Sequence, residues 1–349
     1  MGRLKNAAII GGTGYGAIEL IRLLHTHKHL QVKKIISHSQ FGEHITSVYP
    51  HLTGFVEEPM EKLKITSLIE EVDLIFFATP AGVAKDLIPK FAHSSVQCID
   101  LSGDLRLHSK EQYEKWYGKE AAPQEILNQA VYGLSEIYQE QVKEAKIISN
   151  PGCFPTSALL GLIPAIEQKV ITPNHIVIDG KTAVSGAGRT PTATTHFSET
   201  NENITPYKIG KHQHIPEIDQ TLSELAQETI STTFTTHLIP MTRGLICTIY
   251  AELARDITTE EVIHQYQIYY ENHPFVRIKE IGIFPTTKDV YGSNFCDIGL
   301  HVDERTNQLI IASAIDNLVK GAAGQAIQNA NLMNGWEITE GLDAIPIFP

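Results

Sequence analysis

One cysteine of the sequence lies in a turn whose composition favours a reactive thiol. Cys153 stands in the segment SNPGCFPT at residues 149–156, between an apolar run and a helical pattern. Pro155 fits the first turn of that helix, which places Cys153 close to the helix N-cap. A thiolate there faces unpaired backbone N–H groups and the positive end of the helix, which lower its pKa from a free value of about 8.5. The segment therefore predicts that Cys153 is a nucleophile.

A thiolate nucleophile needs an acid/base partner, and a pair of histidines supplies one. His212 and His214 lie in GKHQHIPEI at residues 210–218. Alternate histidines on a strand also suit a metal ion, but no third ligand lies at a convincing spacing, so acid/base work is favoured over a metal site. We expect His212 to be catalytic and His214 to support or position it, although the sequence leaves their order open.

A glycine-rich turn follows the first apolar run of the chain. The segment AAII at residues 7–10 leads into GGTGYGA at residues 11–17 and then into a helical pattern. Such a turn lets the backbone approach a pyrophosphate, which the helix N-terminus also stabilises. A tight strand-to-helix turn is the alternative, but the position after a first strand favours nucleotide binding. The residues expected to contact the cofactor here are Gly11, Thr13, Gly14, Tyr15 and Gly16.

The end of the second predicted strand indicates which nucleotide is preferred. NAD-binding sites usually carry an acidic residue there, which holds the ribose hydroxyls. This chain has ISHSQ at residues 36–40, without a carboxylate. Ser37 and Ser39, together with the imidazole of His38, can accept the 2′-phosphate that a carboxylate would repel. The sequence therefore predicts NADP(H).

Two arginines are candidates for binding the anionic groups of a substrate. Arg106 lies in the segment SGDLR and Arg189 follows SGAG. A planar guanidinium matches a carboxylate or a phosphate. For Arg106 the alternative is a structural ion pair with Asp104, and for Arg189 a plain surface position.

Strands and helices alternate in the first part of the chain, as a parallel sheet requires. Apolar runs typical of strands lie at 7–10, 32–36, 74–78 and 96–101, and helical patterns lie at 17–24 and 83–91. This alternation predicts a mostly parallel sheet with helices on both faces. A Rossmann domain over residues 1–150 is the expected result.

The pattern changes after about residue 150. A helix is expected near 155–166, with others near 215–227 and 259–271, and strand-like runs lie at 176–179, 235–239, 245–253 and 297–303. Strands with few helices between them predict an α+β domain over residues 151–312, with a mixed or antiparallel sheet. The last helix is expected over residues 315–332.

Length and composition limit the class of protein. At 349 residues, and about 150 residues per domain, two domains are expected. The net charge of −12 argues against nucleic-acid binding, and neither a membrane span nor a secretion signal is evident. Four scattered cysteines suit a reducing cytoplasm, and the three besides Cys153 (Cys98, Cys247 and Cys296) lie in apolar contexts typical of inert core residues.

Several motifs in fixed order resemble the N-acetyl-gamma-glutamyl-phosphate reductase family along nearly the whole chain. They are GGTGYGAIEL at 11–20, IDLSGDLRL at 99–107, VYGLSE at 131–136, SNPGCFPTSALLGLIP at 149–164, VSGAGRTP at 184–191, HQHIPEI at 212–218 and DNLVKGAAGQAIQNANLMNG at 316–335. Two positions depart from the family pattern: Ala17, where members commonly carry glycine, and Gln213, where they commonly carry arginine.

The resemblance implies a fold, a reaction and further site residues. The C-terminal residues 313–349 would complete the Rossmann domain, and the enzyme would be a cytoplasmic homo-tetramer or homo-dimer. It would reduce N-acetyl-glutamyl phosphate with NADPH to the semialdehyde through a thioester on Cys153, releasing phosphate. Substrate contacts are implied for Arg106, Asn150, Arg189, His214 and Glu217, and cofactor contacts for Pro80, Ser185, Gly186 and Asn317.

The same residues are compatible with four other functions. An aspartate-semialdehyde dehydrogenase uses the same thioester chemistry on another acyl phosphate, as does a reductase of aminoadipyl phosphate. A nucleotide-sensing protein would need no chemistry, and the combination of Cys153 with two histidines disfavours it. A thiol hydrolase would not need the glycine turn.

Overall fold

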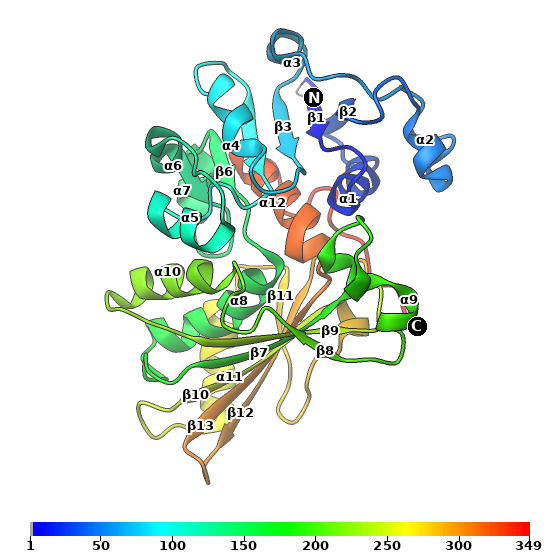
Figure 1. The fold of residues 1–349 in the computed structure, drawn as a ribbon. Helices are drawn as coiled ribbons and strands as arrows, with labels where there is room; N and C mark the ends of the chain where they lie inside the picture. Colours follow the sequence, from blue (N-terminus) through cyan, green and yellow to red (C-terminus); the bar gives the residue numbers. More distant parts are fainter. Residues whose placement is uncertain (1–2) are drawn as a thin grey trace. The chain divides into compact units, whose positions relative to one another are not determined.

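The computed structural model describes residues 3–349, which form two compact units (Figure 1). The first unit extends to Pro151 and includes Ala322–Asp343, and the second comprises Gly152–Gly321 and Ala344–Pro349. The sequence prediction assigned all of residues 313–349 to the first domain. Residues 313–321 belong instead to the second unit because their strand is hydrogen-bonded into its sheet, and the last six residues return there as well.

The first unit is built on a parallel sheet with the strand order β2-β1-β3-β4-β6-β5. Its strands are β1 Lys5–Ile10, β2 Leu30–Ile36, β3 Leu74–Phe77, β4 Gln97–Asp100, β5 Ala130–Tyr132 and β6 Ile147–Ser149. Every residue of the central strand β3 is buried, because helices cover both faces of such a sheet. The predicted Rossmann architecture is confirmed.

Helices connect these strands, and the last helix of the chain also belongs to the first unit. They are α1 Tyr15–Leu24, α2 Ile45–Val48, α3 Ile65–Glu71, α4 Ala84–Leu87, α5 Lys110–Tyr117, α6 Gln124–Gln129, α7 Gln139–Glu144 and α12 Gly324–Met333, with 3₁₀ turns η1 Pro50–Leu52 and η2 Ile88–Lys90. The prediction of one helix over 315–332 is corrected here. A π-helical turn over Val319–Ala323 precedes α12, and Ile315 still belongs to a strand.

The second unit contains a larger, mixed sheet with the order β11-β12-β13-β10-β7-β9-β8. Its strands are β7 Val177–Ala183, β8 Thr205–Tyr207, β9 Thr233–Ile239, β10 Leu245–Glu252, β11 Val276–Ile278, β12 Cys296–Asp303 and β13 Gln308–Ile315. β7 runs antiparallel to β10 and parallel to β9, so the predicted mixed sheet is confirmed.

One face of this second sheet is covered by helices. The helical elements of the unit are α8 Cys153–Glu167, α9 Phe197–Thr200, α10 Ile215–Ala226 and α11 Thr259–Tyr269, with 3₁₀ turns η3 Val184–Ala187, η4 Ala193–Thr195 and η5 Thr287–Val290. α8 packs on β10 and β13, and Ser157 in it donates a hydrogen bond to the carbonyl of Ser313 at 2.9 Å. α10 packs in turn on α8, which brings two distant segments of the sequence together at the start of α8.

Candidate active site

The predicted nucleophile is the first residue of α8. Gly152 is the N-cap, and Cys153 follows it with its side chain partly exposed. The backbone N–H of Gly152 donates a 2.8 Å hydrogen bond to Oε1 of the fully buried Glu217, from the first turn of α10. This bond ties α10 to the turn that carries Cys153, so the structure gives Glu217 a role in holding the turn.

The ring of His214 lies against the same turn. A Cβ atom added to Gly152 would lie 2.4 Å from Nε2 of His214, so only glycine leaves room for the ring. His214 is also the N-cap of α10 and is largely buried. The residue before the nucleophile and the second histidine of the pair are therefore in direct contact.

His212 has a different environment, enclosed by aromatic rings. Its ring centroid lies 5.6 Å from that of Phe154, 5.5 Å from Phe234, 5.7 Å from Tyr207 and 4.7 Å from His214. Burial, with a smaller contribution from the charge of Lys208, lowers the pKa of His212 to about 3. Its Nδ1 accepts a hydrogen bond from the N–H of His214 at 3.1 Å, which places the proton of the neutral ring on Nε2.

The depressed pKa of His212 predicts a loss of stability in acid. Above pH 6.5 the ring is neutral in both the folded and the unfolded chain, so it contributes no pH dependence. Between pH 6.5 and 3 only the unfolded chain takes up the proton, which costs about 2 kcal/mol of stability at pH 5. The free energy of unfolding, measured in urea at pH 8 and pH 5, should fall by about 2 kcal/mol less for His212→Asn than for the unmodified protein. The asparagine keeps an acceptor for the His214 N–H. Equal losses in both proteins would contradict this burial.

The other three cysteines are buried, as predicted. Cys98, Cys247 and Cys296 are each at most 1% exposed. Burial raises the pKa of Cys98 and of Cys247 to about 12, so both remain thiols. The second unit thus combines one accessible thiol with buried, unreactive ones.

Other residues at the site carried no signal in the sequence. A Cβ atom at Gly321 would lie 2.7 Å from Cβ of Cys153, so this glycine lets the π-helical turn approach the nucleophile. Phe154 and Phe234 enclose His212 but are ordinary apolar residues in sequence. Lys208 donates to Oε1 of Gln213 at 2.8 Å, which brings a positive charge beside Gln213.

The glycine turn of the first unit has the shape of a phosphate-binding loop. Gly11 has φ of +92°, and a Cβ atom there would lie 2.4 Å from the carbonyl oxygen of Ala78. Gly14 is the N-cap of α1, and among residues 3–349 no side chain caps that helix. Thr13, whose carbonyl accepts from the hydroxyl of Tyr49 at 3.0 Å, and Tyr15, which begins α1, line the same turn. The cradle fits a nucleotide pyrophosphate.

Three further residues predicted to bind the cofactor lie after β2 and β3, the two strands that flank β1. Ser37 is buried after β2 and accepts from the N–H of Gln40 at 3.2 Å, whereas Ser39 is exposed. Pro80 is exposed after β3, next to Thr79. The Oγ1 atom of Thr79 is shielded from solvent and has no hydrogen-bond partner within the described part of the chain. The carboxyl ends of parallel strands are where ligands of such sheets bind.

Arg106 and Asn150 are held together inside the first unit. Nε of Arg106 donates to the carbonyl of Asn150 at 2.9 Å, and its NH2 group donates to the carbonyl of Leu101 at 3.1 Å. Asp104, the alternative partner of Arg106, accepts from the N–H of Gly82 at 2.7 Å and from Tyr113 Oη at 2.7 Å. Arg106 and Asn150 therefore stabilise the local structure of the first unit through hydrogen bonds.

The remaining predicted residues lie in the second unit, Ser185, Gly186 and Arg189 after β7 and Asn317 after β13. Nδ2 of Asn317 donates to Oγ of Ser185 at 2.9 Å, and its Oδ1 accepts from the N–H of Gly244 at 2.8 Å. Gly186 lies beside this pair, in η3. Arg189 follows at an exposed position. The structure thus brings together Ser185, Gly186 and Asn317, which are far apart in the sequence.

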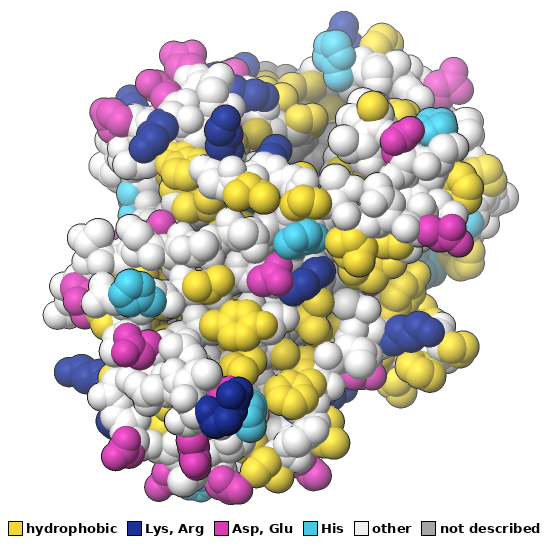
Figure 2. Space-filling view, turned by 60° about the horizontal axis from the view of Figure 1, so that its bottom comes forward, with side chains coloured by type: hydrophobic (Ala, Val, Ile, Leu, Met, Phe, Trp, Pro, Cys, Tyr) yellow, Lys and Arg dark blue, Asp and Glu magenta, His cyan; other side chains and the backbone are white. Residues whose placement is uncertain are grey.

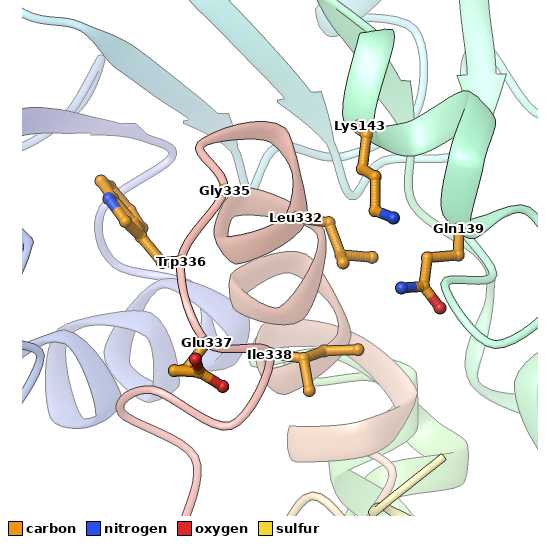
Figure 3. A pocket seen from close by; sticks show the side chains of 7 residues that line it. All are labelled: Gln139, Lys143, Leu332, Gly335, Trp336, Glu337 and Ile338. Atoms are coloured by element: carbon orange, nitrogen blue, oxygen red, sulfur yellow. The ribbon is translucent and has the colours of Figure 1, made fainter. Parts of the chain in front are cut away.

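A surface hollow of about 320 Å³ in the first unit contains none of the residues discussed so far. Figure 3 shows Leu332 pointing into it beside Lys143 and Gln139, with Trp336 turned away. No group of three or more His, Cys, Asp or Glu residues in the described chain could hold a metal ion. Between residues 3 and 349, no helix has the length and apolar character needed to cross a membrane.

Comparisons with known proteins identify the family of the chain. Residues 6–145 match the family described as semialdehyde dehydrogenase, NAD binding domain, and residues 153–317 match semialdehyde dehydrogenase, dimerisation domain. The N-acetyl-gamma-glutamyl-phosphate reductase of Oceanobacillus iheyensis is 61% identical over 99% of this chain and 100% of its own. That of Bacillus subtilis (strain 168) is 48% identical over 98% and 99%.

Two solved structures share the fold at low sequence identity. Aspartate semialdehyde dehydrogenase II of Vibrio cholerae has a TM-score of 0.73 at 18% identity, covering 96% of this chain and 99% of its own. Aspartate semialdehyde dehydrogenase with NADP from Candida albicans has a TM-score of 0.71 at 16% identity, covering 95% and 99%.

Proposed function

Because this chain belongs to the N-acetyl-gamma-glutamyl-phosphate reductase family, we propose that it reduces N-acetyl-L-glutamyl 5-phosphate to N-acetyl-L-glutamate 5-semialdehyde in L-arginine biosynthesis. The observation that carries the proposal is Cys153 at the start of α8, with the ring of His214 against the preceding Gly152. We place the enzyme in the cytoplasm, which four free cysteines support.

The thiol of Cys153 forms the covalent intermediate. Its thiolate attacks the carbonyl carbon of the acyl phosphate, the bond from that carbon to the phosphate oxygen breaks, and inorganic phosphate leaves a thioester behind. The positive end of α8 stabilises the thiolate before attack and after release. Collapse of the reduced intermediate breaks the C–S bond, which frees the aldehyde and restores the thiolate.

We assign the acid/base role to His214 in place of His212, which the sequence alone favoured. His214 contacts the nucleophile's turn, whereas His212 is enclosed by aromatic rings and its pKa of about 3 keeps it neutral near pH 7. His214 takes the thiol proton of Cys153, returns it to the carbonyl oxygen that gains negative charge on reduction, and takes it back when the C–S bond breaks and the aldehyde forms. His212 positions His214 through the hydrogen bond to its backbone N–H.

The first unit would hold the cofactor, which supplies the hydride when bound. Gly11 and Gly14 would lie against its pyrophosphate at the start of α1, and Ser37 and Ser39 beside the ribose. The absence of a carboxylate in ISHSQ at residues 36–40 favours NADP(H) over NAD(H).

A substrate panel tests the proposed reaction. The purified enzyme is supplied with phosphate, NADP⁺ and one of three semialdehydes, those of N-acetyl-glutamate, aspartate and aminoadipate, and reduction of NADP⁺ is followed. We expect turnover with N-acetyl-glutamate semialdehyde. Turnover only with one of the other two would assign another acyl phosphate, and no turnover despite NADPH binding would favour a nucleotide sensor.

Cofactor preference can be tested at Ser39, which is exposed after β2. A carboxylate there would repel the 2′-phosphate, so Ser39→Asp should raise the KM for NADPH by at least about tenfold. The KM for NADH and the kcat should change by less than about twofold, as should all constants of the Ser39→Asn control. An unchanged KM for NADPH in the Asp variant would show that the 2′-phosphate binds elsewhere.

We further propose that two copies of the chain pair through the uncovered face of the second sheet. Val177, Tyr250 and Ile310 lie side by side on neighbouring strands and point to the face opposite α8. Tyr250 is 39% exposed, an unusual position for an aromatic residue at the centre of a sheet. Figure 2 draws a face of the molecule on which hydrophobic side chains gather in patches between charged ones. The match to a dimerisation domain supports this assignment.

The proposed pairing predicts that one charge on this face disrupts the oligomer. Tyr250→Asp would bury a carboxylate in the interface and should raise the dissociation constant at least about a hundredfold, as measured by analytical ultracentrifugation. Ile268→Asp is the matched control, because Ile268 is exposed on α11, which covers the other face. If Tyr250→Asp associates like the unmodified protein, the interface lies elsewhere.

A further inference from the structure

The buried face of α12 carries side-chain amides where a core helix usually carries apolar groups. Gln325, Gln328, Asn329 and Asn331 are each at most 1% exposed. A buried amide destabilises the fold unless its polar atoms are hydrogen-bonded. Because each buried amide depends on its hydrogen bonds to avoid destabilising the fold, its hydrogen-bond partners indicate its role.

Asn329 uses its whole amide to join three segments of the first unit. Its Nδ2 donates to the carbonyl of Gly133 at 2.8 Å and to Oδ1 of Asn150 at 3.1 Å. Its Oδ1 accepts from the hydroxyl of Ser135 at 2.7 Å. Gly133 has no side chain because a Cβ atom there would lie 2.4 Å from Nδ2 of Asn329. The amide is therefore fixed in a single orientation.

Asn150 is held through every polar group it has. Its N–H donates to the carbonyl of Asp100 at 2.8 Å, and its own carbonyl accepts from Nε of Arg106 at 2.9 Å. Its Nδ2 donates to the carbonyl of Ala322 at 3.1 Å, and its Oδ1 accepts from Asn329. Asn150 is fully buried at the end of β6, and Pro151 and Gly152 alone separate it from Cys153.

We infer that Asn329 is a positioning residue for the nucleophile, acting through Asn150 on the turn that begins α8. The inference rests on the proposed role of Cys153. Losing Asn329 leaves Oδ1 of Asn150 without its donor, so the Asn150 side chain is held only by its bond to the carbonyl of Ala322, whereas the carbonyl of Gly133 keeps the bond from Nε2 of Gln325 at 2.9 Å. The backbone from Asn150 to Gly152 is then less constrained, so the thiol of Cys153 no longer keeps a single orientation at the start of α8.

The test compares two neighbouring asparagines of α12. Asn329→Leu removes the bonds to Asn150, whereas Asn331→Leu is equally buried but removes only bonds to Ile338, Glu340 and His27. The readouts are kcat, the KM for NADPH and the rate at which iodoacetamide alkylates Cys153, located by peptide mass spectrometry. We expect Asn329→Leu to lower kcat and the alkylation rate at least about tenfold with little change in KM, and Asn331→Leu to leave the alkylation rate within about twofold.

Two outcomes overturn the inference. One is an alkylation rate for Asn329→Leu like that of the unmodified enzyme, and the other is an equal loss in both variants, which would indicate a packing role only. If Asn329→Leu fails to fold, Ser135→Ala removes the donor to Oδ1 of Asn329 and one of the two acceptors of Gln325 Nε2, which keeps its bond to the carbonyl of Gly133. This variant should lower the alkylation rate by a smaller factor; no change would count against the proposal. Activity retained in Cys153→Ser would instead refute the proposed function itself.

Discussion

Replacing Cys153 by serine should lower kcat at least about 1,000-fold while leaving the dissociation constant for NADPH within about twofold. A serine hydroxyl at the start of α8 is not ionised near pH 7, and the positive helix end that stabilises a thiolate cannot compensate for that difference. Steady-state kinetics and fluorescence titration of NADPH measure the two quantities separately.

Cys247→Ser provides the control for this experiment. Cys247 is fully buried and its pKa is raised to about 12, so it remains a thiol and should contribute nothing to turnover. We expect kcat for Cys247→Ser within about threefold of the unmodified enzyme. If the loss of activity followed Cys247 and spared Cys153, the thioester would have been assigned to the wrong sulfur.

Replacing His214 by asparagine should reduce kcat by about 100-fold to 10,000-fold, the usual contribution of a positioned acid/base group. The asparagine keeps a polar group beside Gly152 but cannot carry the proton of Cys153 to the carbonyl oxygen. The pH dependence of kcat should become weaker, because the residual reaction exchanges protons with water.

His212→Asn is the matched variant for His214→Asn. His212 is neutral above about pH 4 and holds the His214 backbone through Nδ1, a contact that asparagine can replace. We therefore expect a loss of less than about tenfold and an unchanged pH profile. The reverse ranking, with His212→Asn the more damaged enzyme, would return the acid/base role to His212.

The features that could be predicted from sequence are those set by neighbours along the chain. The turn of Gly11 to Gly16 lies between a strand and a helix, and Pro155 marks the start of α8, so both sites follow from local backbone preferences. The mixed sheet likewise follows from long strand patterns. The boundary near residue 315 was missed because apolar residues continue from β13 through the π-helical turn into α12.

Contacts between segments distant in sequence could not be predicted. Two histidines separated by one residue look equivalent in the sequence, yet the packing of α10 on α8 sets His214 against Gly152 and His212 among aromatic rings. In the sequence Asn329 does not differ from the other polar residues of the last helix, and only the fold brings it to Gly133 and Asn150. Such roles depend on tertiary packing, which no local pattern encodes.

Mixing the enzyme with N-acetyl-glutamyl phosphate in the absence of NADPH tests directly whether a thioester forms on Cys153. We expect a burst of about one equivalent of phosphate per chain and an N-acetylglutamyl adduct that peptide mass spectrometry locates on Cys153. Adding NADPH should then release the semialdehyde and remove the adduct. Phosphate released only after NADPH is added, or an adduct on any other residue, would contradict a thioester on Cys153.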